Sequence, residues 1–163
     1  MIRIDRFKAE NPYYSLLDIV SKLPEDLLFS FDNTFKKTIA DIIWHLAYYE
    51  CEYFSNLLRR CALGYGLKIE SFKDIDSPKN LMNKNDVIHW IDFLINERER
   101  NINFLEKNYH YMARNRLIHQ IHGEMVVDDV VEKVKTHDKH HFEQVEAIIH
   151  GTRCDIVKEK QGE

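Results

Sequence analysis

Four segments of this sequence carry apolar residues at intervals of three and four, and they constrain the fold more than any other feature. That spacing places the apolar side chains on one face of an α-helix. The 163 residues include only five glycines and three prolines, and all except Gly162 near the C-terminus fall at the ends of the segments or between them. The pattern therefore predicts an all-α protein.

Capping and breaking residues set the expected bounds of these segments. The first should run from Asn11-Pro12 to Pro24, the second from Asn33, Thr34 or Thr38 to Gly64, the third from Asn85 or Asp86 to residue 108, and the fourth from Asp128 or Asp129 to Gly151. The polar connection 68–85 should hold at most a short helical turn. Around Gly123 the pattern permits a short hairpin or an extended loop, and residues 109–127 are treated as irregular.

A chain of this length fits a single domain with a core of its own. We expect that domain to span residues 1–155, and the charged tail 156–163 to be disordered. Amphipathic helices bury their apolar stripes by facing one another. The expected architecture is a four-helix bundle, in which the connection 68–85 is a long crossover between two helix pairs.

Composition narrows the class of protein. The net charge is -4 and no basic run occurs, which argues against a nucleic-acid partner. No apolar run reaches the roughly 18 to 20 residues needed to cross a bilayer, and the first 25 residues lack a secretion signal. Cys51, Cys61 and Cys154 show no CxxC spacing and suit reduced thiols. We expect a cytoplasmic protein without membrane attachment.

Two histidines interrupt the apolar stripe of the last segment, where Val134 is followed on the same face by His137 and His141 before Val145 resumes the stripe. A buried imidazole needs a carboxylate, a water molecule or a metal ion as its partner. Residues four apart on a helix lie about 5 to 6 Å apart, so two imidazoles at this spacing can converge on one ion. His140 lies near the same face and is either a competing ligand or a neighbour of the site.

A third ligand is expected from another helix, because catalytic metal sites usually take three protein groups. His45 borders the inward face of the second segment, between Ile42 and Tyr49. Together with His137 and His141 it would form a three-histidine site with an open position, suited to zinc, nickel, iron or manganese. The alternative is that these are ordinary histidines, hydrogen-bonded or exposed, since chance readily produces an HxxxH pair in a chain with nine histidines.

The stretches "TIADIIWHLAYYECEYF" and "HGEMVVDDVVEKVKTHDKHHFEQVEAII" resemble the DinB-like family, also described as YfiT-like metalloenzymes. The similarity covers roughly residues 10 to 150 and includes Gln144. It implies a four-helix bundle with a divalent metal bound by one histidine of the second helix and an HxxxH pair of the last, here His45, His137 and His141. It also implies chemistry such as S-transfer from small thiols like bacillithiol or mycothiol, or isomerisation.

Two classes of function follow from this interpretation. The first is a metal-dependent enzyme acting on a small molecule, as a thiol S-transferase or a hydrolase, because a metal with a vacant position activates a bound thiol or water. The second is a non-catalytic metal-binding bundle with a structural or stress-related role, which a fourth protein ligand such as His140 or Glu52 would favour. No catalytic residue is identified. Apolar surface at Trp44 and Tyr48 predicts a homodimer.

Other polar residues near the stripes permit two interpretations each. Tyr49, Glu52 and Tyr53 either line the pocket or belong to the core. Glu97, Arg98 and Asn101 either contact a substrate or form an exposed charged face. His119 and His122 form an HxxH pair in the segment treated as irregular, where nothing requires the two rings to converge on one ligand. We favour the core for the tyrosines and an exposed face for "NERERN". The HxxH pair is left out of the site.

Overall fold

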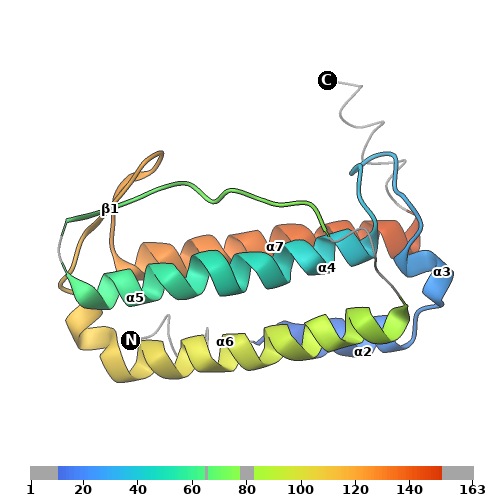
Figure 1. The fold of residues 1–163 in the computed structure, drawn as a ribbon, viewed down its shortest axis with the longest axis horizontal. Helices are drawn as coiled ribbons and strands as arrows, with labels where there is room; N and C mark the ends of the chain where they lie inside the picture. Colours follow the sequence, from blue (N-terminus) through green and yellow to red (C-terminus); the bar gives the residue numbers. More distant parts are fainter. Residues whose placement is uncertain (1–10, 65, 78–82, 152–163) are drawn as a thin grey trace.

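The computed structural model describes residues 11–64, 66–77 and 83–151, and most of them are helical. The helices are α2 (Tyr13–Ser21), α3 (Glu25–Leu28), α4 (Ile39–Tyr48), the π-helical η1 (Tyr49–Phe54), α5 (Ser55–Leu63), α6 (Lys84–Met112) and α7 (Val127–His150). Because α4, η1 and α5 follow without a break, they form one long helix. Figure 1 shows this helix running beside α7, while α2 lies beside α6.

Side-chain caps fix where the long helices begin. The Thr38 hydroxyl accepts a hydrogen bond from the Asp41 backbone, and the Asp41 carboxylate accepts one from the Thr38 backbone. Asn83 and Asp86 form the same reciprocal pair at the start of α6, so this helix begins before the expected Asn85. Such a capping box satisfies backbone N–H groups that have no partner within the helix. At the C-terminal end of α7, Gly151 has a φ of 68° and ends the helix as predicted.

A small three-stranded sheet lies at one end of the helices, beside the mainly helical structure that the sequence predicts. Strand β2 (Leu117–His119) pairs in parallel with β1 (Leu67–Ile69) and antiparallel with β3 (Gly123–Met125). The short hairpin that the sequence permits around Gly123 is therefore present. The prediction that residues 109–127 are irregular is wrong. Strands of three residues are too short to show an alternating pattern, and β1 pairs across a long sequence separation.

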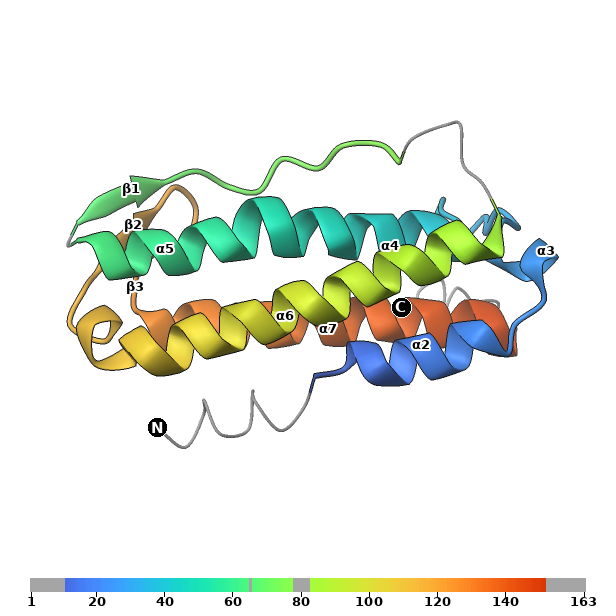
Figure 2. The ribbon, with the colours of Figure 1, turned by 60° about the horizontal axis from the view of Figure 1, so that its bottom comes forward.

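From β1 the chain runs back along α5 and α4 as residues 70–77, without regular secondary structure (Figure 2). The expected tail 156–163 and Cys154 lie outside the described residues. None of the described helices is long and apolar enough to cross a membrane. Trp44, one source of the predicted dimer surface, is half-buried and packs on Tyr48 and Trp90 of the same chain. The homodimer stays a prediction.

The apolar core is divided into two clusters. One joins α2, α4 and the first half of α6 with the end of α7, and Leu16, Ile43 and Leu94 are among its fully buried members. The other joins η1, α5, the second half of α6 and the start of α7, around residues such as Leu58 and Val130. Each long helix therefore contributes apolar residues to both clusters. Between the clusters, the same helices bury polar side chains.

The guanidinium of Arg98 on α6 lies in this polar layer, with only 1% of the residue exposed. It donates two hydrogen bonds to the Glu50 carboxylate, both 2.8 Å, and one of 2.9 Å to Asp138. The Tyr13 hydroxyl donates to the other oxygen of Asp138 at 2.8 Å, and Asn101 donates to Glu50 at 2.9 Å. These five side chains link α2, η1, α6 and α7.

The buried network corrects the expectation that "NERERN" forms an exposed face. Glu97 is half-buried and Arg100 is exposed, but Arg98 and Asn101 point into the core. Burial alone would lower the pKa of Arg98; the Glu50, Tyr13 and Asp138 groups raise it well above its ordinary value. The guanidinium therefore stays charged and holds two carboxylates in the interior.

The π-helical turn η1 determines which residues of the long helix face this layer. A π-turn carries about one residue more per turn than an α-helix. Within this turn the consecutive side chains of Tyr49 and Glu50 are both buried, at 4% and 0% exposure. Tyr49 stacks on His137, with ring centroids 3.8 Å apart, whereas Glu50 binds Arg98.

We expect Arg98→Met to lower the free energy of unfolding by about 3 to 5 kcal/mol, because it leaves the buried Glu50 and Asp138 carboxylates without their cation. Urea unfolding followed by circular dichroism measures this loss. Arg100→Met is the matched control on the same helix: its side chain is 78% exposed and pairs with Glu97, so it should cost less than about 1 kcal/mol. Equal losses for the two variants would contradict the role of the buried network.

Candidate metal centre

Three imidazoles converge at the edge of the polar layer. One ring nitrogen from each of His45, His137 and His141 lies within 4.8 Å of the others. The Nε2 atoms of His45 and His137 are 2.9 Å apart, and the ring centroid of His141 lies 4.5 Å from that of His45 and 4.6 Å from that of His137. The structure therefore brings together the three residues that the sequence singles out.

The helices explain this convergence. His45 lies in the last turn of α4, and His137 and His141 lie one turn apart on α7, which packs directly on α4. His141 follows Val134 and precedes Val145 on the buried face of α7, so the apolar residues on both sides of it hold that face against α4. The imidazoles occupy the gap that the two apolar clusters leave between them.

Hydrogen bonds on the outer ring nitrogens orient two of the histidines. His45 Nδ1 lies 2.8 Å from an Asp74 carboxylate oxygen, and His141 Nδ1 lies 2.8 Å from the Gln144 side-chain oxygen. Because these oxygens accept hydrogen bonds, each Nδ1 carries the hydrogen and each Nε2 presents its lone pair to the cluster. Partners of this kind are typical of metal-ligating histidines.

His137 provides the test of whether these residues fit a metal. Its Nδ1 is buried, and no hydrogen-bond partner for it occurs within the described part of the chain. Its Nε2 faces the lone pair of His45 Nε2 at 2.9 Å. Two nitrogens that bind one ion at about 2.1 Å lie about 3.0 to 3.4 Å apart, depending on the coordination geometry. The observed spacing of 2.9 Å lies close to the lower end of this range, so the two Nε2 atoms fit a shared divalent ion.

A family model described as the DinB superfamily matches residues 12–145, which is most of the chain. The chain belongs to the DinB superfamily. No protein with a curated description matches the sequence. The match spans all three histidines and agrees with the mainly helical fold, so the resemblance stated from the sequence is confirmed at the level of the superfamily.

Burial keeps the three histidines neutral. Together with the neighbouring imidazoles, it lowers the pKa of His137 to about 2 and that of His141 to about 4. Burial also lowers the pKa of His45, although Asp74 opposes the shift. Neutral imidazole is the form that binds a metal. At neutral pH the lone pairs are therefore available without loss of a proton.

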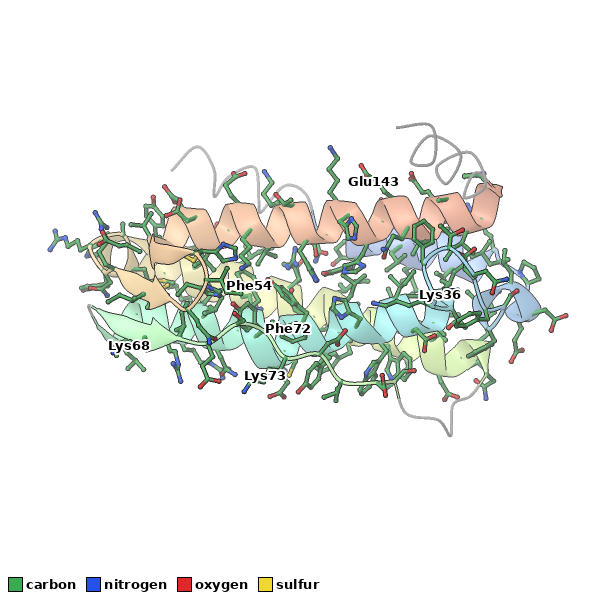
Figure 3. The ribbon with its side chains drawn as sticks, turned by 90° about the horizontal axis from the view of Figure 1, so that it is seen from above. Lys36, Phe54, Lys68, Phe72, Lys73 and Glu143 are labelled. Atoms are coloured by element: carbon green, nitrogen blue, oxygen red, sulfur yellow. The ribbon has the colours of Figure 1, made fainter. Side chains whose placement is uncertain are left out.

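Residues 70–77 cover one side of the cluster. The ring of Phe72 contacts those of His45 and Tyr49, with centroids 5.6 and 5.0 Å apart, and Asp74 binds His45. Figure 3 places Phe72 near the middle of the molecule's length. Ser77 donates a hydrogen bond to the Asp41 carboxylate and so ties the segment to the start of α4. This segment excludes solvent from the His45 side.

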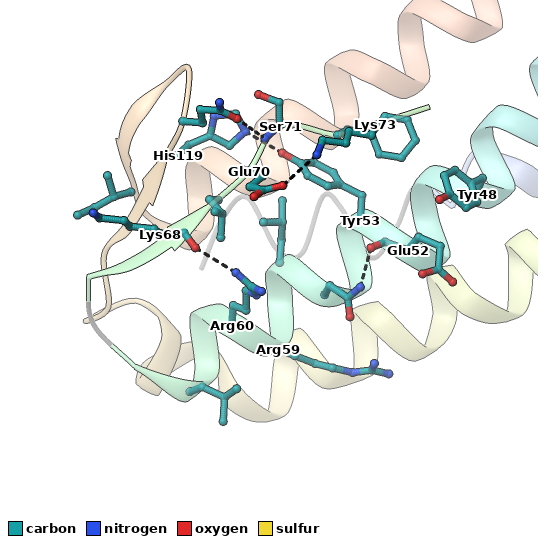
Figure 4. A pocket seen from close by; sticks show the side chains of 17 residues that line it. Tyr48, Glu52, Tyr53, Arg59, Arg60, Lys68, Glu70, Ser71, Lys73 and His119 are labelled. Carbon is teal, nitrogen blue, oxygen red and sulfur yellow. Dashed lines mark hydrogen bonds and ion pairs between the residues drawn. The ribbon is translucent and has the colours of Figure 1, made fainter. Parts of the chain in front are cut away.

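Two cavities near the cluster differ in what they reach. The larger, about 1050 Å³, lies between α5 and the segment β1 to Lys73 and contains none of the three histidines (Figure 4). The smaller, about 660 Å³, lies between the β2–β3 hairpin and α7, and His137 forms part of its wall. Of these two cavities, the smaller one reaches the cluster, through His137.

The remaining candidate residues lie at different distances from the site. Tyr49 stacks on His137, whereas Tyr53 lies 2.8 Å from His119 Nε2 through its hydroxyl. His119 Nδ1 accepts two backbone N–H groups, so its ring is held within the hairpin and does not converge with His122 on the cluster. Glu52 and His140 are exposed, and neither belongs to the three-histidine group.

Two contributors to the site were missed in the sequence. Asp74 lies in an irregular segment, so no periodicity indicates that it reaches His45. Asp138 follows His137 on α7 and turns to Arg98. Asp138 is a carboxylate next to a histidine in the apolar stripe of α7, and Arg98 interrupts the apolar stripe of α6. These two opposite charges at stripe positions are the signal that could have predicted the pair.

We predict that the metal-free protein loses stability as the pH falls from 6.5 toward 4. The unfolded chain binds protons on histidine near pH 6.5, whereas His141 in the folded state binds one only near 4, so lower pH favours unfolding. This group alone accounts for about 2 kcal/mol at pH 5. Urea unfolding in the presence of a chelator measures the free energy of unfolding at each pH. This free energy should depend less steeply on pH in His141→Leu than in the unsubstituted protein.

The control for this series is His140→Leu, the exposed neighbour on the same helix. It should keep the pH dependence of the unsubstituted protein. An identical slope for His141→Leu and the unsubstituted protein would contradict a buried, neutral His141.

Proposed function

We propose that this protein is a metal-dependent enzyme in which His45, His137 and His141 hold a divalent ion, and that it transfers a small thiol to an electrophilic substrate. The observation that carries the proposal is the convergence of three neutral, oriented imidazoles beside an open cavity. Proteins of the DinB superfamily often bind a metal. We further propose that α2, the α4–η1–α5 helix, α6 and α7 form the four-helix bundle of that superfamily.

The number of ligands favours an enzyme over a structural metal site. Structural zinc sites are usually closed by four protein ligands, whereas catalytic sites keep a position for water or substrate. Within the described ranges, the cluster contains three candidate ligands, and the nearby carboxylates of Asp74 and Asp138 are engaged by His45 and Arg98. A coordination position is therefore left for a molecule entering from the smaller cavity.

The surroundings of the cluster favour a thiol over hydrolysis. A divalent ion at the three histidines would lower the pKa of a bound thiol or water. Hydrolytic metal sites commonly add a glutamate as general base. The two buried carboxylates nearby, Glu50 and Asp138, are both bound to Arg98. A thiol, with an ordinary pKa of about 8.5, loses its proton far more readily than water does, so it depends less on a general base from the protein to become a nucleophile.

The residues of this chain contribute orientation and exclusion of water to such a reaction. Asp74 and Gln144 hold the imidazoles of His45 and His141 with Nε2 inward, and Tyr49 supports the His137 ring by stacking. Residues 70–77 cover the His45 side, and the cavity wall formed by His137 offers substrate an approach from the other side. Nickel and zinc suit this donor set best, and iron or manganese can also occupy it.

We expect His141→Ala to abolish stoichiometric binding of zinc or nickel. Calorimetric titration of the metal into protein that a chelator has stripped of metal measures this binding. Helical content should stay nearly unchanged, because the apolar clusters and not the ion supply most of the burial. His140→Ala is the matched control, because it removes an exposed imidazole from the same helix and should retain one ion per chain. Equal metal binding by the two variants would remove His141 from the site.

The catalytic part is tested with cobalt-loaded protein and a small thiol. Direct coordination should produce a sulfur-to-cobalt charge-transfer band, and the loaded protein should accelerate displacement of chloride from chlorodinitrobenzene by the thiol. His141→Ala should show neither effect. Stoichiometric metal without a thiol band or thiol-dependent turnover would favour the alternative, a metal-binding bundle with a structural role.

A further inference from the structure

The smaller cavity has a chemical character that the three histidines do not explain. It lies between the β2–β3 hairpin and α7, and its lining consists of His122, Glu124, Met125, Asp129, Lys133, Thr136, His137 and His140. Three charged residues are present, two acidic and one basic. The cavity favours a ligand that pairs with whichever of these charged side chains has no partner within the protein.

Both acidic side chains of the cavity already have partners. Glu124 on β3 forms an ion pair of 3.0 Å with Arg116. The Asp129 carboxylate accepts a hydrogen bond of 2.9 Å from the Val126 backbone at the start of α7, where it also favours the positive end of the helix. The negative charges of the lining are therefore directed to the hairpin and to the helix terminus.

Lys133 is the remaining charge. It is half-buried, and burial lowers its pKa. No carboxylate within 4 Å of its ammonium group is found in the part of the chain that the structure describes. The groups that face it from the hairpin are His119, His122 and the paired Glu124, and those from its own helix are Asp129, His137 and His140. A half-buried ammonium without a counter-ion favours an anionic ligand.

The position of Lys133 on α7 relates it to the cluster. Lys133 and His137 are four residues apart, so they lie on the same helix face about 6 Å apart along the axis. A small molecule whose sulfur occupies the open coordination position would place a group two or three bonds away within reach of the Lys133 ammonium. That distance suits a short thiol bearing a carboxylate.

We propose that the cavity between the β2–β3 hairpin and α7 is the substrate site, and that Lys133 binds the carboxylate or a similar anionic group of a small thiol substrate. This inference rests on the proposed function, since it assumes that the thiol sulfur binds at the three histidines. Lys133 is then a specificity-determining residue that selects anionic thiols over neutral ones of the same length.

The larger cavity is a weaker candidate for this role. Figure 4 shows Arg60 directed to the backbone oxygen of Lys68, at 3.0 Å, and Lys73 directed to Glu70, at 3.4 Å. Arg60 and Lys73 therefore have acceptors, whereas Arg59 and Lys68 also line this cavity. What makes the cavity the weaker candidate is that none of the cluster histidines lines it. A thiol bound there would not present its sulfur to the metal centre.

The test compares mercaptopropionate with mercaptopropanol, which have the same chain length but differ in the carboxylate. Cobalt-loaded protein is titrated with each thiol, and the charge-transfer band gives the two dissociation constants. We expect mercaptopropionate to bind about tenfold more tightly, which corresponds to about 1.4 kcal/mol. Lys133→Met should abolish this preference while leaving the affinity for mercaptopropanol unchanged, because methionine keeps the apolar stem.

Two further variants support or overturn the assignment. Lys133→Arg should keep the preference, and Lys139→Met should also keep it, because Lys139 is an exposed lysine of the same helix outside the cavity. Asp129→Asn retains an acceptor for the Val126 backbone but removes the carboxylate that α7 contributes to the cavity lining, so it should strengthen the preference.

The outcomes separate this inference from the proposed function. A charge-transfer band with equal affinity for both thiols, or a preference that survives in Lys133→Met, would overturn the role of Lys133 and leave the thiol site intact. If neither thiol produces a band, the proposed function itself fails. Should Lys133→Met not fold, the Asp129→Asn and Lys133→Arg titrations still decide, because loss or reversal of the expected preference in them contradicts the inference.

Discussion

The ion pairs of Arg98 with Glu50 and Asp138 are the interaction on which the rest of the structure depends. Burying three charges costs several kcal/mol for each ion unless their geometry is close to ideal. Here the guanidinium meets one carboxylate with two hydrogen bonds and the other with one, and Tyr13 and Asn101 satisfy further oxygens. The arrangement tolerates little rotation of the long helices, since a small rotation would leave a buried charge unpaired.

The fixed rotation matters because the histidines are immediate neighbours of the network. Asp138 follows His137 on α7, and Glu50 follows Tyr49 on η1. When Arg98 holds Asp138 and Glu50 on one side of the polar layer, His137 and Tyr49 are directed to the other side, where they stack. His45 on α4 and His141 on the next turn of α7 complete the group. The three-histidine cluster and the charge network are therefore two halves of one layer.

The sequence predicted the parts of this protein that follow from periodicity. The stripe through Val134, His137, His141 and Val145 placed two histidines on the buried face of α7, and helical spacing brought His45 to the same region. The Thr38 cap and the Gly151 end of α7 were also predictable, because their local chemistry requires no knowledge of other segments.

Features that depend on contacts between distant segments could not be predicted in this way. Arg98 and Asn101 interrupt an apolar stripe, which usually indicates an exposed position, and only their buried partners on η1 and α7 reverse that interpretation. Asp74 reaches His45 from an irregular segment. The π-turn has no distinct composition, and the strands of the sheet are too short for a period to appear.

The π-turn also has a consequence for how relatives of this protein can vary. If residues 49–54 wound as an α-helix without a change in length, every side chain after them would rotate by about 100° about the helix axis, because the π-turn accommodates one extra residue. That change would separate the aromatic support of His137 from the acceptor for Arg98, and it would turn the apolar face of α5 away from its cluster. Substitution can change these side chains one at a time, but a change of winding at η1 changes the histidine side and the charged side of the layer together.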